Sequence, residues 1–306
     1  MRTTPREIVG MAAVLLPCTP SGKIDWSCTE AHIARTLDSG LTPAVNMDTG
    51  YVQMLDERSK RRVLDLAAEV TAGNFVAGAF VADAEGDSFD LDAYLGEATA
   101  IASRGGTPVI FPSHGLNGGS EETWIEALTA IGANLDRFLG FELGSMFVPY
   151  GRIFSLDAYR AMLDIRTCVG AKHSSLNREL EWQRLALRDE VRPDFMVLTG
   201  NDLAIDMVTY GSDYLLGLAT FAPDVFAERD RLWAIGDPAF YGLNDTLQYL
   251  GQFAFRPPVP AYRHNAAMFL HLRGWATSDA VPSGTPHRPE SDRAILRDIA
   301  ERLGVL

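Results

Sequence analysis

Lysine and cysteine are both scarce in this sequence of 306 residues, with three of each. The cysteines, at positions 18, 28 and 168, are odd in number and show no CxxC spacing and no paired histidines. This pattern excludes a disulfide framework and a zinc site as the expected organisation. Unpaired thiols fit a reducing compartment, so we predict a cytoplasmic protein.

Clustered positive charge is also lacking, because the net charge is −13 and the sequence pI is about 4.9. Nucleic acids and anionic membranes require grouped Lys and Arg, so we expect neither as a partner. The longest basic cluster, 58–62, follows Asp56 and Glu57 at helical spacing and is interpreted as a solvated helix face. The first apolar stretch, about seven residues long, is too short for a membrane span.

Short apolar runs alternate with amphipathic stretches along the first three quarters of the chain, which is typical of parallel βα units. The predicted strands are 10–17, 43–48, 74–80, 108–113, 138–144, 168–174, 195–200 and 214–219. The predicted helices are 27–39, 56–72, 90–104, 120–134, 155–164, 178–189, 202–210 and 223–235. No strand is followed by GxGxxG or GxxxxGK[ST], which disfavours a nucleotide-binding open sheet.

Eight such units predict a (β/α)8 barrel, the TIM barrel of the α/β class, over residues 1–235. Beyond position 235 the strand rhythm stops, and three further helices are expected at 238–253, 260–272 and 291–303. We therefore predict a C-terminal helical domain over residues 236–306.

Catalytic groups of such barrels lie where strands end, and the sixth predicted strand carries Lys172. Lys23 lies in a turn and Lys60 on the charged helix face, whereas Lys172 follows an apolar strand. A buried ammonium loses solvation, and the neutral amine favoured there is a nucleophile toward ketones. A structural ion pair inside the barrel is the alternative. The turn after the second strand, Asp48-Thr49-Gly50, offers a hydroxyl and amides to a carboxylate, although it also fits a plain loop.

These segments resemble the family of dihydrodipicolinate synthase and N-acetylneuraminate lyase, pyruvate-dependent barrel enzymes. The resemblance spans nearly the whole chain, through AVLLPCTPSGKIDW, MDTGYVQMLDERSKRRVL, VGAKHSSLN, LTGND and YLLGLATFAP. It implies that Lys172 is the Schiff-base lysine, that Thr49 and the Gly50 amide hold the carboxylate, and that Gly200 and Leu216 line the pocket. It also implies a homo-oligomer, a dimer or a tetramer.

The sequence departs from the family pattern at Asp48, Tyr51 and His173, and more seriously in the tyrosine relay of the family. The fifth strand has Phe141 where the family has a tyrosine, or Met146 if the alignment starts from the downstream Val-Pro. His114 stands at the place of a second tyrosine. Dihydrodipicolinate synthase itself is therefore disfavoured, and another lyase, aldolase or dehydratase acting on pyruvate or another 2-oxo acid is expected.

In that mechanism protons move through His114, Glu142 or Asp48, and Arg152 binds a distal carboxylate or hydroxyl. Each has a structural alternative: a hydrogen-bonded loop histidine, a Glu142–Arg152 ion pair, a helix cap and a surface arginine. No metal and no cofactor are required, because the protonated imine supplies the electrophile. The alternative function is a barrel that binds a 2-oxo or sugar acid without turnover, as a sensor or partner subunit.

Overall fold

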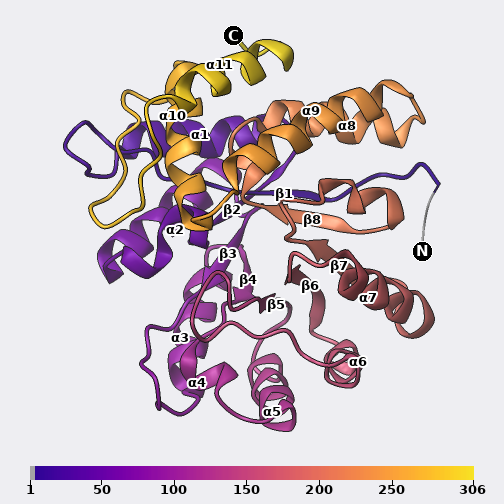
Figure 1. Ribbon diagram of the computed structural model, residues 1–306. Helices are drawn as coiled ribbons and strands as arrows, with labels where there is room; N and C mark the ends of the chain where they lie inside the picture. Colours follow the sequence, from indigo (N-terminus) through magenta and orange to yellow (C-terminus); the bar gives the residue numbers. More distant parts are fainter. Residues whose placement is uncertain (1–3) are drawn as a thin grey trace.

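The computed structural model describes residues 4–306 and consists of a closed barrel of eight parallel strands surrounded by helices (Figure 1). Each strand pairs with its neighbours in chain order, and β1 closes the barrel against β8. The predicted (β/α)8 barrel with C-terminal helices is confirmed. No helix within residues 4–306 is both long and apolar enough to cross a membrane.

The strands are short, because only the segments that pair around the barrel are regular. Their bounds are β1 Gly10–Ala13, β2 Thr42–Val45, β3 Val76–Ala79, β4 Thr107–Ile110, β5 Phe138–Leu143, β6 Cys168–Ser174, β7 Met196–Thr199 and β8 Asp213–Leu216. All eight predicted strands exist, and β6 has the predicted bounds. The residues beyond the other strand ends form the loops at the C-terminal rim.

The helices of the barrel units lie outside the sheet. Their bounds are α1 Trp26–Asp38, α2 Glu57–Thr71, α3 Leu91–Ala102, α4 His114–Asn117, α5 Glu121–Gly132, α6 Leu156–Asp164, α7 Arg178–Val191 and α8 Pro223–Ala234. The Ser120 hydroxyl accepts a hydrogen bond from the Thr123 amide at 3.3 Å and caps the start of α5. The helix expected at 202–210 is a 3-10 helix, Ile205–Tyr210, and Asp202 lies before it.

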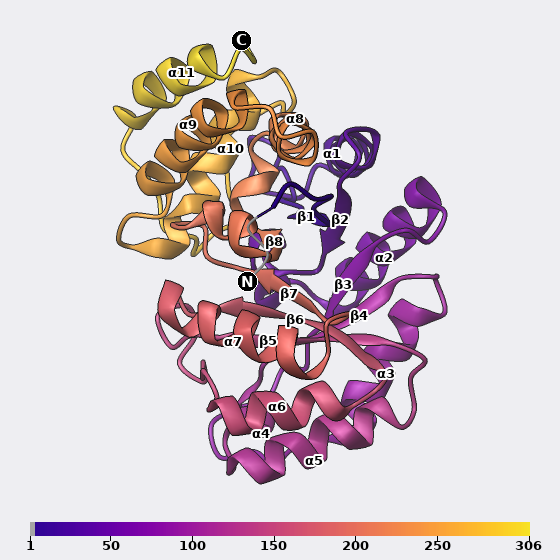
Figure 2. The ribbon, with the colours of Figure 1, turned by 90° about the vertical axis from the view of Figure 1, so that its right-hand side faces the viewer.

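Three helices follow the barrel: α9 Ala239–Ala254, α10 Tyr262–Leu272 and α11 Asp292–Arg302. They lie together at one side of the barrel, beside α8 (Figures 1 and 2). Their inner faces are apolar, with Leu247, Leu250, Phe269 and Leu296 fully buried. This segment is therefore packed onto the barrel and can contribute side chains to the barrel rim.

Residues of β5 and β6 alternate between the barrel interior and the layer beneath the helices. Leu139 and Phe141 of β5 belong to the interior cluster, whereas Phe138 packs in the outer layer. In β6, Ala171 faces the outer layer, and Cys168 does so as well because the register between β5 and β6 shifts by one residue after Cys168. This alternation is the pleat of a strand, so neighbouring residues at the sites below point in opposite directions.

Candidate active site

Lys172 lies on β6 and points into the barrel near its C-terminal rim. Its Nζ is 4.6 Å from the centroid of the Phe141 ring, and Phe141 is its register partner on β5. Within residues 4–306, no hydrogen bond and no ion pair engages this nitrogen. Burial lowers the pKa of Lys172, and the charges of Asp202 and Asp48 oppose that effect. The side chain is half-buried because it borders a pocket.

The pocket beside Lys172 is small, with an empty volume of about 350 Å³. Its polar lining consists of Asp48, Thr49, Lys172, Ser174, Asp202 and Tyr262. Its apolar lining includes Phe141, Leu143, Phe147 and Phe255. An apolar cavity with a few convergent polar groups is the usual form of a small-molecule site.

Gly200, at the end of β7, makes room for the lysine. A Cβ at this position would lie 2.7 Å from Lys172 Cε and 2.0 Å from Ser174 Oγ, so any larger residue would displace both side chains. The Ser174 hydroxyl is buried and has no hydrogen-bond partner among the described residues. Gly200 lines the pocket as expected, and Ser174 offers it an unpaired donor.

The turn after β2 forms a short 3-10 helix, Asp48–Gly50, at the pocket edge. The Gly50 amide donates to the Met47 carbonyl at 3.0 Å, so the expected use of this amide for a carboxylate is corrected. The first two amides of the turn, those of Asp48 and Thr49, donate to no group within residues 4–306. Arg263 Nη1 lies 3.7 Å from Asp48 Oδ1 and offsets the negative charge there.

Asp202, after β7, is a site residue that sequence reasoning missed, since it was interpreted as the start of a helix. Its Oδ1 accepts a hydrogen bond from the Leu218 amide at 2.7 Å, and its Oδ2 accepts none from any described residue. Burial raises the pKa of Asp202 to about 7, although the Leu218 amide and the charge of Lys172 act in the opposite direction. The carboxyl group can therefore exchange protons near neutral pH.

Tyr262, at the start of α10, is a second missed residue. Its hydroxyl lies 2.8 Å from Thr49 Oγ1, and it donates to Asp48 Oδ2 at 3.3 Å. Searching strand ends could not find Tyr262, because it belongs to a C-terminal helix. For Asp202 a signal existed, since it follows a strand as closely as the other rim residues do.

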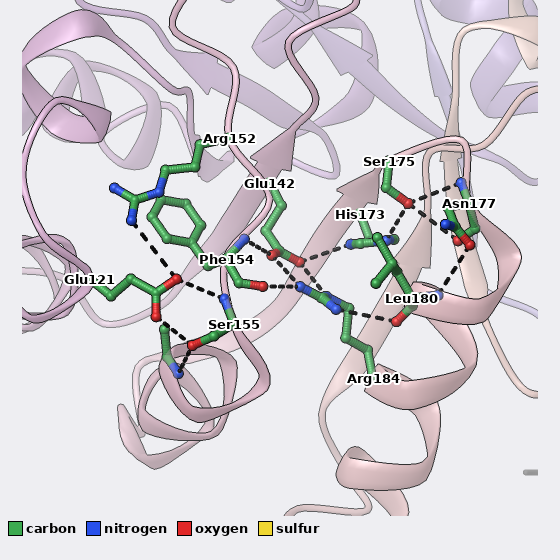
Figure 3. A network of polar contacts seen from close by, with 11 residues as sticks. Glu121, Glu142, Arg152, Phe154, Ser155, His173, Ser175, Asn177, Leu180 and Arg184 are labelled. Atoms are coloured by element: carbon green, nitrogen blue, oxygen red, sulfur yellow. Dashed lines mark hydrogen bonds and ion pairs between the residues drawn. The ribbon is translucent and has the colours of Figure 1, made fainter.

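Glu142 points away from the pocket, into a buried polar network beneath α7 (Figure 3). Arg184 donates to both of its carboxylate oxygens at 2.7 Å, and the Phe154 amide donates to Oε1 at 3.0 Å. His173 Nδ1 lies 2.9 Å from Oε2, and the Ser175 hydroxyl lies 2.7 Å from His173 Nε2. Because the strand pleat turns Glu142 outward, it is corrected from a catalytic candidate to a member of this network.

The remaining candidates also lie outside the Lys172 pocket. The His114 ring packs against that of Tyr150 in a tilted arrangement, with centroids 4.6 Å apart, and both residues line a separate hollow of about 1230 Å³ beside α4. Arg152 donates to the Gly119 carbonyl at 2.6 Å and lies 3.9 Å from Glu121, so the suggested pair with Glu142 does not form. Leu216 packs in the outer layer, and its neighbour Gly217 lines the pocket instead.

Lys60 provides a contrast with Lys172. It was expected on a solvated face, but it is only 4% exposed, and its Nζ lies 2.5 Å from Glu57 and 3.6 Å from Glu97. Its Nζ also lies 5.9 Å from the centroid of the Phe80 ring, so the ammonium of this buried lysine is both enclosed and paired. Of these two enclosed lysines, only Lys172 faces a pocket without an ion-pair partner.

Comparisons with known proteins give a fold but no sequence relative. No protein-family model matches the sequence, and no curated protein matches it. Among solved structures, a monomeric dihydrodipicolinate synthase variant is similar with a TM-score of 0.82 at 18% identity, covering 98% of this chain and 97% of that chain. Dihydrodipicolinate synthase from Thermotoga maritima is similar with a TM-score of 0.80 at 18% identity, covering 98% and 99%.

A prophage protein of the dihydrodipicolinic acid synthase family from E. coli K12, solved in complex with pyruvate, has a TM-score of 0.78 at 16% identity. It covers 97% of this chain and 99% of its own. The chain therefore has the barrel and the C-terminal helices of these proteins over nearly its whole length. Likeness at this level of identity establishes the fold, and the chemistry must be argued from the site itself.

Proposed function

We propose that this chain is a class I aldolase or lyase that forms a Schiff base between Lys172 and a 2-oxo acid. We further infer that it is a divergent member of the dihydrodipicolinate synthase and N-acetylneuraminate lyase family. The observation that carries the proposal is the unpaired Lys172 amine beside a pocket, with its pKa lowered by burial. The fold shared with proteins solved in complex with pyruvate supports it.

In this reaction the neutral Lys172 amine attacks C2 of the 2-oxo acid, and the carbonyl oxygen takes up a proton. Loss of that oxygen as water leaves an iminium ion. Its nitrogen then accepts electrons as a C3–H or C3–C4 bond breaks, which gives an enamine. We assign Asp202 to the proton transfers of imine formation, because its pKa of about 7 suits both taking and returning a proton.

The carboxylate of the ligand is assigned to the turn after β2. The free amides of Asp48 and Thr49 take the role that the sequence gave to Gly50, and Arg263 offsets the adjacent carboxylate of Asp48. The Ser174 hydroxyl adds a donor from the strand that carries Lys172. The chain is disfavoured as a dihydrodipicolinate synthase, since Phe141 has no hydroxyl where the family has its tyrosine.

The second candidate function is binding of a 2-oxo or sugar acid without turnover, and Phe141 is the observation that favours it. The centroid of this ring lies 4.6 Å from Lys172 Nζ, and the ring offers the pocket no hydroxyl. A small pocket and a missing strand hydroxyl fit a sensor or a partner subunit as well as an enzyme. The two functions differ in turnover, which an assay measures directly.

The test is reductive trapping. The purified protein is incubated with pyruvate, 2-oxobutyrate or a hydroxylated 2-oxo acid, reduced with borohydride and analysed by peptide mass mapping. We expect an adduct on Lys172, none on Lys60, and none in Lys172→Met. Lys60→Met is the matched control, because it also removes an enclosed lysine but leaves the pocket intact.

The outcomes separate the candidates. An adduct on Lys172 together with turnover of a 2-oxo acid supports the lyase. An adduct without turnover on any compound of the panel favours the binding function. Absence of an adduct with every 2-oxo acid overturns the Schiff-base proposal. Assembly as a dimer or tetramer and a cytoplasmic location stay predictions, which light scattering and fractionation test.

A further inference from the structure

The hydroxyl of Tyr262 contacts two neighbouring side chains, those of Asp48 and Thr49, in the turn at the edge of the Lys172 pocket. It is 2.8 Å from Thr49 Oγ1 and 3.3 Å from Asp48 Oδ2, although it comes from the C-terminal segment. Its ring stacks on Phe255 with centroids 4.2 Å apart, and the residue is only 3% exposed. Tyr262 is therefore fixed in place by packing rather than free to rotate.

The backbone at the end of β8 leaves space for this contact. A Cβ at Gly217 would lie 3.1 Å from Thr49 Oγ1 and 3.3 Å from the Tyr262 hydroxyl, so a side chain there would press on both. The pocket thus has a phenol from α10, whereas β5 contributes only Phe141 and Leu143, neither of which has a hydroxyl. Of the pocket-lining residues within 4–306, Tyr262 alone carries a phenol.

The three side chains form a directional chain of hydrogen bonds. An ionised Asp48 can only accept hydrogen bonds, whereas the hydroxyls of Thr49 and Tyr262 each have one proton to donate. The complete arrangement has Thr49 donating to Tyr262 and Tyr262 donating to Asp48. Gln53 donates to Asp48 Oδ1 at 3.1 Å and Arg263 lies near the same oxygen, so Oδ2 is left for Tyr262. Burial and the charge of Asp48 keep the pKa of Tyr262 well above its usual value, so the phenol holds its proton at neutral pH.

We propose that Tyr262 and Asp48 form the proton relay for the 2-oxo acid bound at Lys172, with Thr49 orienting the phenol. The inference rests on the proposed function. When the C3–H bond of the iminium breaks, its proton passes to the Tyr262 oxygen while the proton of Tyr262 passes to Asp48. The C–H electrons form the C2–C3 double bond, and the iminium π electrons move onto nitrogen. The reverse transfer returns a proton to C3.

The experiment follows this single proton transfer and needs no second substrate. Pyruvate is incubated with the protein in D2O, and exchange of its C3 protons is followed by NMR. Borohydride trapping of pyruvate on Lys172 is measured in parallel, and thermal melting checks the fold. The variants are Tyr262→Phe and Asp48→Asn, with Tyr150→Phe as the matched control because that tyrosine lines the separate hollow beside α4.

We expect both relay variants to reach the same end point of pyruvate trapping as the unchanged protein. In Asp48→Asn the pH dependence of trapping should move toward lower pH, because the charge of Asp48 raises the pKa of Lys172. In both variants the exchange rate should fall by at least about 10²-fold, the usual contribution of a positioned acid or base. Tyr150→Phe is expected to keep both signals. Normal exchange in folded Tyr262→Phe and Asp48→Asn would overturn the relay, and so would loss of trapping together with exchange, since the residues would then only shape the pocket. Should Tyr262→Phe fail to fold, Asp48→Asn decides the question.

If the unchanged protein traps no pyruvate and no other 2-oxo acid, the proposed function itself fails. If it traps pyruvate but exchanges no C3 protons, only the relay fails. The two failures are therefore distinguishable.

Discussion

The two faces of β6 place ionisable side chains in opposite situations, although the residues are adjacent in the chain. On the outer face, His173 contacts Glu142 and Ser175, and Arg184 completes the network (Figure 3). On the inner face, Lys172 has no hydrogen-bond partner among the described residues, and the Ser174 hydroxyl has none either. The polar groups on the outer face are hydrogen-bonded to one another, whereas those on the inner face have no hydrogen-bond partner among the described residues.

This difference separates stabilising groups from reactive ones. A buried charge with every partner in place contributes to the specificity of packing, whereas a buried polar group without a partner is costly and is kept where a ligand uses it. Lys60 and Lys172 repeat the comparison with one residue type, since only Lys60 has carboxylate partners.

Lys172→Met should abolish adduct formation with 2-oxo acids, because no amine remains in the pocket. The same substitution should raise the melting temperature by a few degrees. A lysine whose pKa is lower in the folded state than in the unfolded chain costs stability at neutral pH, and methionine removes that cost. Calorimetry and peptide mapping measure the two effects. A drop in melting temperature would contradict the view that this amine is held for reaction.

Glu142→Gln should destabilise the protein by about 3–5 kcal/mol, because it leaves the buried guanidinium of Arg184 without its counter-charge. Denaturant unfolding measures the change. Glu190→Gln is the control, since Glu190 pairs with Arg160 at the surface and its loss should cost no more than about 1 kcal/mol. If the two substitutions changed the free energy of unfolding equally, the buried network would stabilise the protein no more than a surface ion pair does.

The network also predicts the response to acid. Burial alone would raise the pKa of Glu142, but hydrogen bonds and charges from Arg184 and His173 hold it at about 2, below its ordinary value of 4.5. A lowered carboxylate pKa stabilises the folded state above about pH 4.5, and this contribution is lost as the pH falls toward 2. Stability of the unchanged protein should therefore decline over that window, and Glu142→Gln should flatten the decline.

Asp202→Asn should shift the pH at which trapping is half-maximal toward lower values. The negative charge of Asp202 raises the pKa of Lys172, so its removal lowers that pKa further and leaves more neutral amine at a given pH. The maximal rate of adduct formation should fall as well, because asparagine cannot accept the proton that we assign to Asp202. A pH profile of adduct formation tests this, and a shift toward higher pH would mean that Asp202 does not face the lysine.

His114→Ala and Arg152→Ala should have the smallest effects, changing turnover by no more than about twofold, as expected for partly exposed side chains away from the pocket. Steady-state assays with the best 2-oxo acid of the panel would measure this. A loss of about 10²-fold in turnover in either variant would show that the residue takes part in catalysis. The loops at the C-terminal rim would then have to adopt another conformation in the active protein.

The barrel and the lysine could be predicted from the sequence because both depend on local patterns. All eight strands could be predicted from continuous apolar runs. The place of the pocket could be predicted from the position of Lys172 near the end of a strand. Glu142 was misplaced because catalytic candidates were chosen by proximity in sequence, while the pleat sends alternate residues to opposite faces. The same pleat explains why Gly217, and not Leu216, lines the pocket.

The partners of the site were harder to predict, because they are non-local. Nothing in the sequence around Tyr262 indicates that its helix packs against the turn at Thr49. Asp202 resembled a helix cap, since an aspartate before an amphipathic stretch usually is one, but its carboxylate binds the Leu218 amide instead. The surroundings of Lys60 likewise include residues distant in sequence, Phe80 and Glu97, which the pattern of its own helix does not contain.

The contact between Thr49 and Tyr262 spans 213 positions of the chain, and it has a consequence for biosynthesis. A polypeptide is made from its N-terminus, so the segment with Lys172 leaves the ribosome before the segment with Tyr262. At translation rates of about 5–20 residues per second, roughly 5–20 seconds separate the two. Tyr262 can therefore contact Thr49 only after all eight strands of the barrel have been synthesised, so the proposed relay is completed later than the strand that carries Lys172.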